Sequence, residues 1–189
     1  MARTGRQMNY DELVVRSKTQ PEALGKLYDL YYERIFRFCV HRLFNFEVAE
    51  DVTSRIFLGV AKGIGHFQGE TEQDFKRWLY AIAINYINAY IRKTSRRKKL
   101  FEQAISMRTI KDGYSEDNHA YLDWPALYAA ILKLKPEHQT ILTLRFFEGM
   151  DYNEIGQIAG AQTSTVRVTL HRILNKLRVF LEDVQYGAE

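Results

Sequence analysis

The sequence of 189 residues lacks several features that would indicate other classes of protein. Its single cysteine, Cys39, excludes an internal disulfide framework and fits a reducing cytoplasm. No apolar run reaches about 18 residues, so no transmembrane helix is expected, and the N-terminus lacks the apolar segment of a secretory signal. The five histidines show no metal-ligand spacing, and no glycine-rich phosphate loop occurs. These absences predict a cytoplasmic protein without a metal or cofactor, and they give no support to a nucleic-acid enzyme.

The chain also contains only three prolines, and each lies where a helix can begin or end. No strand-like alternation of apolar and polar residues competes with helical spacing. The segment 101–122 has weak periodicity and a local acidic bias, so it is predicted to be a linker. We therefore expect an all-α protein with two small helical domains, over 1–100 and 123–189, joined by a flexible linker over 101–122. The apolar spacing predicts helices over 21–38, 46–62, 75–99, 122–135, 136–148, 152–159 and 164–177.

The net charge of +4 is unevenly distributed along the chain. Residues 1–100 contain 18 Lys and Arg against 11 Asp and Glu, a net charge of +7, whereas the remainder has a net charge of −3. The basic excess is highest in the stretch IRKTSRRKK, which starts at Ile91 and contains no acidic residue. Such a run is typical either of a solvated helix end or of a surface that binds nucleic acid. Both interpretations stay open on this run alone.

The stretch 152–177, YNEIGQIAGAQTSTVRVTLHRILNKL, has the pattern of a helix-turn-helix. Val166, Leu170 and Ile173 recur on one face of the second helix, which is predicted to be buried. A helix of this size fits the major groove of DNA, where Arg167 would hydrogen-bond guanine and later basic residues would contact phosphates. A helical hairpin with a solvated polar face is the alternative from spacing alone. The face predicted to contact DNA carries Ser164, Thr165, Arg167, Val168, His171, Arg172 and Lys176.

This C-terminal stretch resembles region 4 of bacterial extracytoplasmic-function (group 4) sigma factors of the sigma-70 family. The usual pattern there is Leu-Arg-aromatic, then Tyr-x-Glu-Ile, then Thr-Val followed by Leu-His-Arg. The N-terminal domain independently resembles region 2 through 49–57 and 66–97. The two matching regions occur in the family's order and cover most of the chain. The matching residues of region 4 lie at 144–146, 152–155, 165–166 and 170–172.

The resemblance implies a protein that binds core RNA polymerase and directs promoter-specific initiation of transcription, with no catalytic site of its own. It implies that the C-terminal helix reads the −35 element of promoter DNA, while the N-terminal domain melts the −10 element and captures unpaired bases. Such capture needs a cationic surface and pockets for bases. The implied −10 contacts are Phe67, Gln68, Gly69, Asn85, Asn88, Arg92, Lys93, Arg96 and Arg97. The implied contacts with core polymerase are Glu50, Asp51, Ser54 and Phe57.

The sequence departs from the family's core-binding pattern, approximately Glu-Asp-x-x-Gln-Glu-x-Phe, because Ser54 and Arg55 replace Gln and the second Glu. If Arg55 faces the basic coiled coil of the polymerase, like charges repel, and if it points elsewhere nothing changes. Phosphorylation of Thr53 or Ser54 by a Ser/Thr kinase would restore negative charge. The expected regulators are therefore such a kinase or an anti-sigma factor held between the two DNA-binding domains. An ordinary transcription regulator, with a sensing or dimerising N-terminal domain, is the alternative for the whole chain.

Overall fold

The computed structural model describes residues 9–94 and 124–186, and every element in those two ranges is helical. The N-terminal half contains α1 (Tyr10–Ser17), α2 (Pro21–Leu43), α3 (Phe46–Gly63), the 3₁₀ turn η1 (Ile64–His66) and α4 (Glu72–Lys93). The C-terminal half contains α6 (Trp124–Leu132), α7 (Pro136–Phe146), α8 (Tyr152–Ala159) and α9 (Thr163–Tyr186). The predicted all-α class is confirmed for this part of the chain, and the predicted linker lies outside it. Within the same ranges, no helix has the length and hydropathy that a bilayer span requires.

Polar side chains determine where several of the helices begin. The Asn45 side chain accepts a hydrogen bond from the Val48 N–H at 2.8 Å, so α3 begins where the sequence pattern predicts. Helix α4 begins three residues earlier than predicted, because Thr71 and Asp74 form a capping box there. The apolar spacing did not predict α1, which has only eight residues and is capped by the side chain of Asn9. Capping residues therefore position the helix ends more closely than apolar spacing does.

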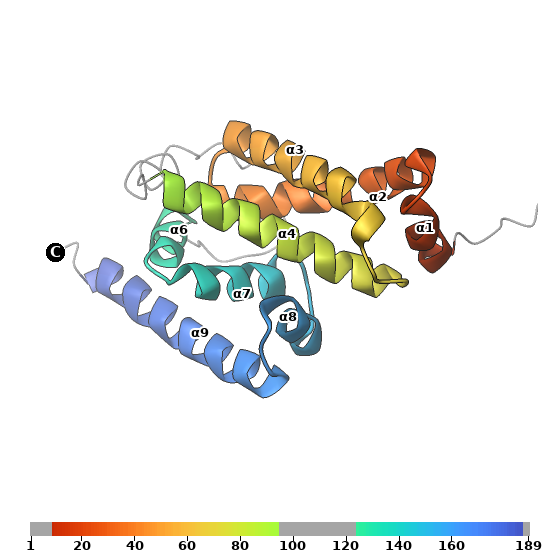
Figure 1. Ribbon diagram of the computed structural model, residues 1–189. Coiled ribbons are helices and arrows are strands. Elements are labelled where there is room, and N and C mark those ends of the chain that lie inside the picture. The colour runs from red at the N-terminus through yellow and green to blue at the C-terminus, as the bar shows by residue number, and fades with distance from the viewer. Residues whose placement is uncertain (1–8, 95–123, 187–189) are drawn as a thin grey trace, which may run out of the picture.

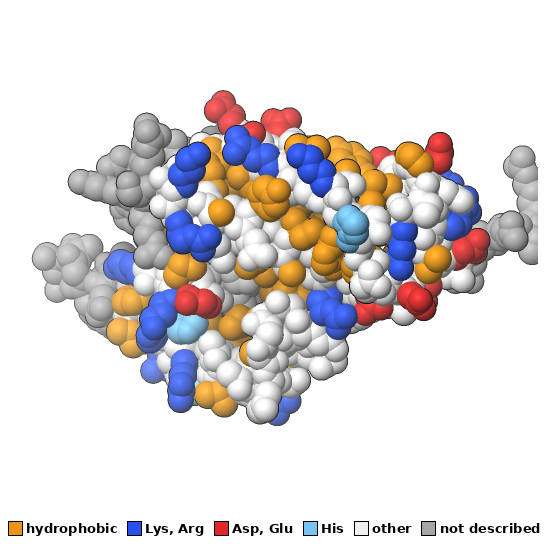
Figure 2. Space-filling view, in the orientation of Figure 1, with side chains coloured by type: hydrophobic (Ala, Val, Ile, Leu, Met, Phe, Trp, Pro, Cys, Tyr) orange, Lys and Arg blue, Asp and Glu red, His pale blue; other side chains and the backbone are white. Residues whose placement is uncertain are grey.

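The two halves of the chain lie against each other as two layers, with α1–α4 in one and α6–α9 in the other (Figure 1). Within its layer, the long helix α4 faces the other layer: it packs against α2 and α3 on one side and against α8 on the other. Helix α2 also contacts α7, so the halves meet along two pairs of helices. Figure 2 shows the surface of the molecule in the same orientation, with hydrophobic side chains gathered over its middle and Lys and Arg side chains around them.

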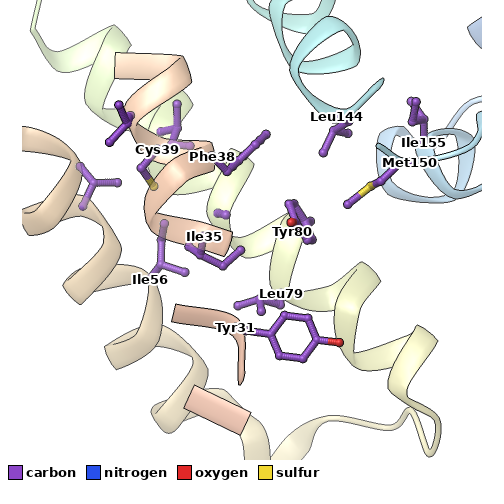
Figure 3. Close-up of a cluster of buried hydrophobic side chains, with 14 of the residues drawn as sticks. Tyr31, Ile35, Phe38, Cys39, Ile56, Leu79, Tyr80, Leu144, Met150 and Ile155 are labelled. Carbon is purple, nitrogen blue, oxygen red and sulfur yellow. The ribbon is translucent and has the colours of Figure 1, made fainter. Parts of the chain in front are cut away.

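One cluster of buried side chains runs through both halves (Figure 3). Phe38 and Tyr80 pack edge to face in the N-terminal half, with ring centroids 5.3 Å apart. Leu144 and Met150 of the C-terminal half point towards them, and both are almost fully buried. Cys39 is buried in the same cluster, as predicted, and burial raises the pKa of its thiol to about 12. The cores of the two halves are therefore continuous.

Candidate nucleic-acid interface

The predicted helix-turn-helix is formed by α8, a tight turn and α9. Helix α8 begins in a capping box, in which the Asp151 side chain accepts from the Glu154 N–H at 2.8 Å and the Glu154 side chain accepts from the Asp151 N–H at 2.9 Å. The helix ends at Gly160, whose φ of 66° lies in the left-handed region that glycine adopts readily. The Ala161 N–H donates to the Gly156 carbonyl at 2.9 Å. A Cβ atom at Gly156 would lie 2.6 Å from the Ala161 carbonyl oxygen. Only glycine at position 156 therefore lets the turn pack this closely against α8.

The second helix of the motif, α9, presents the predicted face to solvent. Val166, Leu170 and Ile173 form its buried side, which confirms the prediction from their spacing. The Arg167 guanidinium lies 5.4 Å from the centroid of the Tyr152 ring, so α8 helps to orient this arginine. The exposed residues on this face include all seven predicted DNA contacts, Ser164, Thr165, Arg167, Val168, His171, Arg172 and Lys176.

A cavity of about 430 Å³ lies between the loop after η1, the first half of α4 and α8. Phe67 stacks on Trp78 beside it, with ring centroids 4.7 Å apart, and both side chains are half-buried against the core. Arg77 donates to Asp74 at 2.9 Å, so a cation and a carboxylate share one wall. The cavity therefore combines an aromatic surface with charged groups. The predicted −10 residues that line it are Phe67, Gln68 and Gly69, and the α8 residues that line it are Gln157 and Ile158.

The second half of α4 exposes most of the other predicted −10 contacts. Asn85, Arg92 and Lys93 are exposed, and the last turn of the helix is basic, which suits a phosphate backbone. Asn88 differs, because it is half-buried and its Oδ1 has no hydrogen-bond partner among the described residues. The predicted contacts at 96 and 97 lie outside the described residues.

Helix α3 carries the predicted polymerase contacts, and the fold separates them into exposed and buried groups. Glu50, Asp51 and Ser54 are exposed. Arg55 is exposed as well, but its Nη2 lies 2.9 Å from Asp51 Oδ2, so its charge is paired within the helix. Thr53 is fully buried, and a kinase cannot reach its hydroxyl in this fold. The prediction of phosphorylation at Thr53 is therefore wrong, because this residue lies on the core side of α3. Ser54, by contrast, is accessible to a kinase.

Phe57, the fourth predicted polymerase contact, supports this surface from beneath. Only 8% of it is exposed, and its ring lies 4.8 Å from that of Tyr28 and 6.1 Å from that of Tyr32, measured between centroids. Tyr28 and Leu58 are 41% and 55% exposed, and the sequence pattern did not single them out. The sequence signal that could have identified them is that both are large apolar residues, yet they lie outside the helical spacing of the buried residues of α2 and α3.

Two family models match the chain. The model described as Sigma-70 region 2 matches residues 27–97, and the model described as Sigma-70, region 4 matches residues 130–179. RNA polymerase sigma factor YlaC of Bacillus subtilis is 30% identical over 162 residues, which cover 83% of this chain and 91% of YlaC. ECF RNA polymerase sigma factor BldN of Streptomyces coelicolor is 28% identical over 174 residues, which cover 91% of this chain and 66% of BldN.

Solved structures share the fold. The structure of CnrH in complex with the cytosolic domain of CnrY has a TM-score of 0.67 at 16% identity, covering 92% of this chain and 97% of that one. The structure of the sigma factor RpoE in complex with the anti-sigma factor NepR, from Bartonella quintana, has a TM-score of 0.59 at 18% identity. That match covers 84% of this chain and 96% of RpoE. At these identities the likeness concerns the fold alone.

Proposed function

The chain belongs to the extracytoplasmic-function sigma factors of the sigma-70 family, and we propose that α9 and the cavity beside α4 divide promoter recognition between them. As an RNA polymerase sigma factor, it directs promoter-specific transcription initiation through region 2 and region 4. The polymerase forms the bonds of the RNA chain, and this chain has no catalytic role of its own. It acts together with the polymerase in the cytoplasm. The observation that carries the proposal is the combination of an exposed helix-turn-helix face with an aromatic cavity beside the first half of α4, a helix whose last turn is basic.

The −35 element is assigned to the exposed face of α9. A helix of this kind enters the major groove, where its N-terminal residues reach base edges and its later cations contact phosphates. Arg167, which lies over the Tyr152 ring, is assigned to guanine, and Val168 offers a methyl group to thymine. Arg172 and Lys176 are assigned to phosphates, since they are exposed one and two turns further along the helix.

The −10 element is assigned to the cavity beside α4. An unpaired base needs an aromatic face to stack on, and the adjoining backbone needs cations. The stacked pair of Phe67 and Trp78 offers the aromatic surface, and Arg77 supplies a cation at the wall. Asn85 and the basic end of α4 extend this surface along the path that a single strand would take.

Core RNA polymerase is assigned to the exposed face of α2 and α3. Glu50 and Asp51 supply exposed acidic groups on α3, and Tyr28 of α2 and Leu58 of α3 supply exposed apolar side chains. Ser54 is the accessible position at which a Ser/Thr kinase would add charge. RpoE of Bartonella quintana was solved with the anti-sigma factor NepR, and a protein inhibitor of that kind is the other proposed regulator of this chain.

Run-off transcription with purified core RNA polymerase tests the proposal. Transcripts from a pool of promoter fragments are expected only when the chain is added. Arg167→Ala should change which −35 sequences are used, because it removes a base contact. Arg178→Ala, an exposed arginine further along the same helix, should weaken all sequences about equally, because it removes at most a phosphate contact.

Duplex binding distinguishes the alternative of an ordinary transcription regulator. A sigma factor is expected to bind free promoter duplex poorly and to select sequence as part of the polymerase complex. Tight sequence-specific binding without polymerase, together with no transcripts in its presence, would contradict the proposal and support the regulator.

A further inference from the structure

Helix α1 and the turn after it contact the loop that lines the proposed −10 cavity. This loop, residues 67–71, runs from η1 to α4 and is called the −10 loop below. Figure 1 shows α1 at the same end of the molecule as the −10 loop. Helix α1 precedes residue 27, where the match to region 2 begins, and none of the expected promoter or polymerase contacts lies on it. Its contacts therefore add a part of the chain to the −10 surface that the family pattern does not include.

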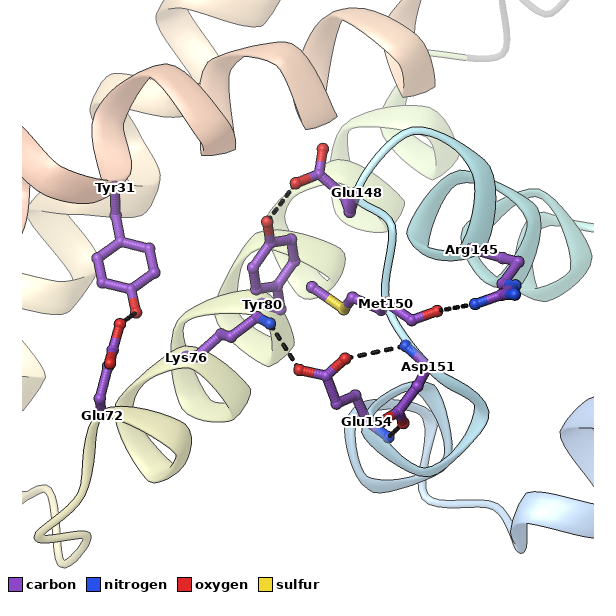
Figure 4. Close-up of polar contacts among 9 residues, drawn as sticks. All are labelled: Tyr31, Glu72, Lys76, Tyr80, Arg145, Glu148, Met150, Asp151 and Glu154. Carbon is purple, nitrogen blue, oxygen red and sulfur yellow. Dashed lines mark hydrogen bonds and ion pairs between the residues drawn. The ribbon is translucent and has the colours of Figure 1, made fainter.

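Asp11 of α1 holds the point at which the −10 loop enters α4. Its carboxylate accepts a hydrogen bond at 2.7 Å from the Glu72 N–H, one of the N–H groups that an α-helix leaves unpaired at its start. The Tyr31 hydroxyl of α2 donates to the Glu72 carboxylate at 3.0 Å (Figure 4). Tyr31 is fully buried, so it fixes the Glu72 side chain from the core. The first residue of α4 is therefore held by α1 through its backbone and by α2 through its side chain.

The −10 loop is closed tightly around Asp74 and the Phe67 ring. The Asp74 carboxylate accepts hydrogen bonds from the backbone N–H groups of Glu70 and Thr71, both at 3.3 Å. A Cβ atom at Gly69 would overlap the Phe67 ring and the Cβ atom of Asp74, so no side chain fits there. Because the backbone packs this closely on the ring, a change in the position of the ring would move the loop as well.

Lys18, in the turn after α1, lies over the Phe67 ring. Its ammonium is 5.7 Å from the ring centroid, within the range in which a cation is attracted to an aromatic face. Phe67 lines the cavity and stacks on Trp78, whereas Lys18 is not among the residues that line it. The Lys18 carbonyl oxygen lies 4.0 Å from the position of a Cβ atom at Gly65, so the turn also borders η1. Lys18 therefore reaches the cavity only through the Phe67 ring.

We propose that Lys18 is a positioning residue for the −10 element, whose cation keeps the Phe67 ring in the orientation that an unpaired base requires. This inference rests on the proposed function, because it takes Phe67 as a contact of that base. A binding surface that is already in its bound geometry loses less freedom when the ligand arrives. A ring held in one orientation also distinguishes bases by shape better than a ring that can turn to fit several. Lys18 should therefore affect selectivity at the base that Phe67 contacts, and at no other.

Run-off transcription with core RNA polymerase, on all single-base variants of one −10 element, tests the inference. The ratio of transcript yields at each position measures how strongly the chain discriminates among bases there. Lys18→Met keeps an unbranched apolar side chain but removes the cation. Discrimination should fall by about two- to fivefold at the position that Phe67→Leu also affects, which is the factor that a cation over an aromatic ring contributes at a partly exposed site. Lys18→Arg keeps the cation and should restore discrimination.

Two controls separate positioning from a general effect on folding. Lys26→Met makes the same change at an exposed position of α2 and should leave every ratio as it is in the unaltered chain. Lys18→Met should also leave discrimination among −35 sequences unchanged, because α9 is far from α1 in the fold. An equal loss of transcripts from all promoters, together with a lower Tm, would overturn the inference in favour of a purely structural role for Lys18.

A double-mutant cycle distinguishes positioning from direct contact with DNA. In the Phe67→Leu background, Lys18→Met should cause no further loss of discrimination, because the ring through which Lys18 acts is absent. The salt dependence of promoter binding by the polymerase complex should be the same with Lys18→Met as with the unaltered chain. A slope smaller by about one, or a full effect in the Phe67→Leu background, would show that Lys18 contacts a phosphate itself and would overturn the inference.

The same measurements distinguish failure of the inference from failure of the proposed function. Silence of the unaltered chain with core polymerase, or unchanged −10 discrimination in Phe67→Leu, would overturn the proposed function and the inference with it. Unchanged discrimination in Lys18→Met, beside a clear effect of Phe67→Leu, would overturn the inference alone.

Discussion

Replacing Gly156 with alanine is expected to destabilise the helix-turn-helix, although the same change improves helix propensity. Alanine in a helix interior is favoured over glycine by about 1 kcal/mol. At Gly156, however, the new Cβ atom would lie 2.6 Å from the carbonyl oxygen of Ala161, which belongs to the backbone of the turn. That oxygen would have to move by about 0.4 Å to reach the shortest contacts that proteins tolerate, and overpacking of this kind costs about 1–3 kcal/mol. The net expectation is a loss of up to about 2 kcal/mol in the free energy of unfolding.

Gly25→Ala is the matched control, because it makes the same substitution in α2 where a Cβ atom meets nothing within 4 Å. It should raise the free energy of unfolding by up to about 1 kcal/mol. Thermal unfolding followed by circular dichroism compares the two variants, with Tm expected to fall by up to about 8 °C for Gly156→Ala and to rise by up to about 4 °C for Gly25→Ala. If Gly156→Ala were as stable as Gly25→Ala, the close packing of the turn against α8 would be refuted.

Three further predictions concern the other surfaces of the chain. Thr53→Glu should destabilise the fold by about 3 kcal/mol or more in urea unfolding, because it buries a charge, whereas Ser54→Glu should change stability by less than about 0.5 kcal/mol. Burial against Phe147 lowers the pKa of His41 to about 4, so the unfolded chain binds a proton that the folded chain does not, and stability should fall as the pH drops from about 6.5 to 4. The loss has an upper bound of about 3 kcal/mol and should disappear in His41→Phe, as equilibrium unfolding across that pH range would show. Phe67→Ala should reduce strand opening at the −10 element in permanganate footprinting, because it removes the ring that stacks on Trp78, and it should leave the −35 contacts unchanged. Unchanged opening would contradict the assignment of Phe67 to the −10 element.

The sequence by itself determined most of the helices and the face of α9. Local signals specify these features: Asn45 caps α3, Gly160 adopts the left-handed turn, and the spacing of Val166 and Ile173 predicts which side of the helix is buried. A helix end depends on hydrogen bonds within one turn, and a buried stripe depends on the 3.6-residue period. Both can therefore be predicted without knowledge of the partner surface.

Only the tertiary structure decided which side chains a partner can reach and how the two halves meet. Thr53 and Ser54 are neighbours in the sequence, but the packing of α3 on α2 buries one and exposes the other. The pairing of Tyr80 with Glu148, and the contribution of α8 to the wall of the cavity beside α4, join residues about 70 or more positions apart. Such contacts depend on the complementarity of two complete surfaces, which no local periodicity encodes.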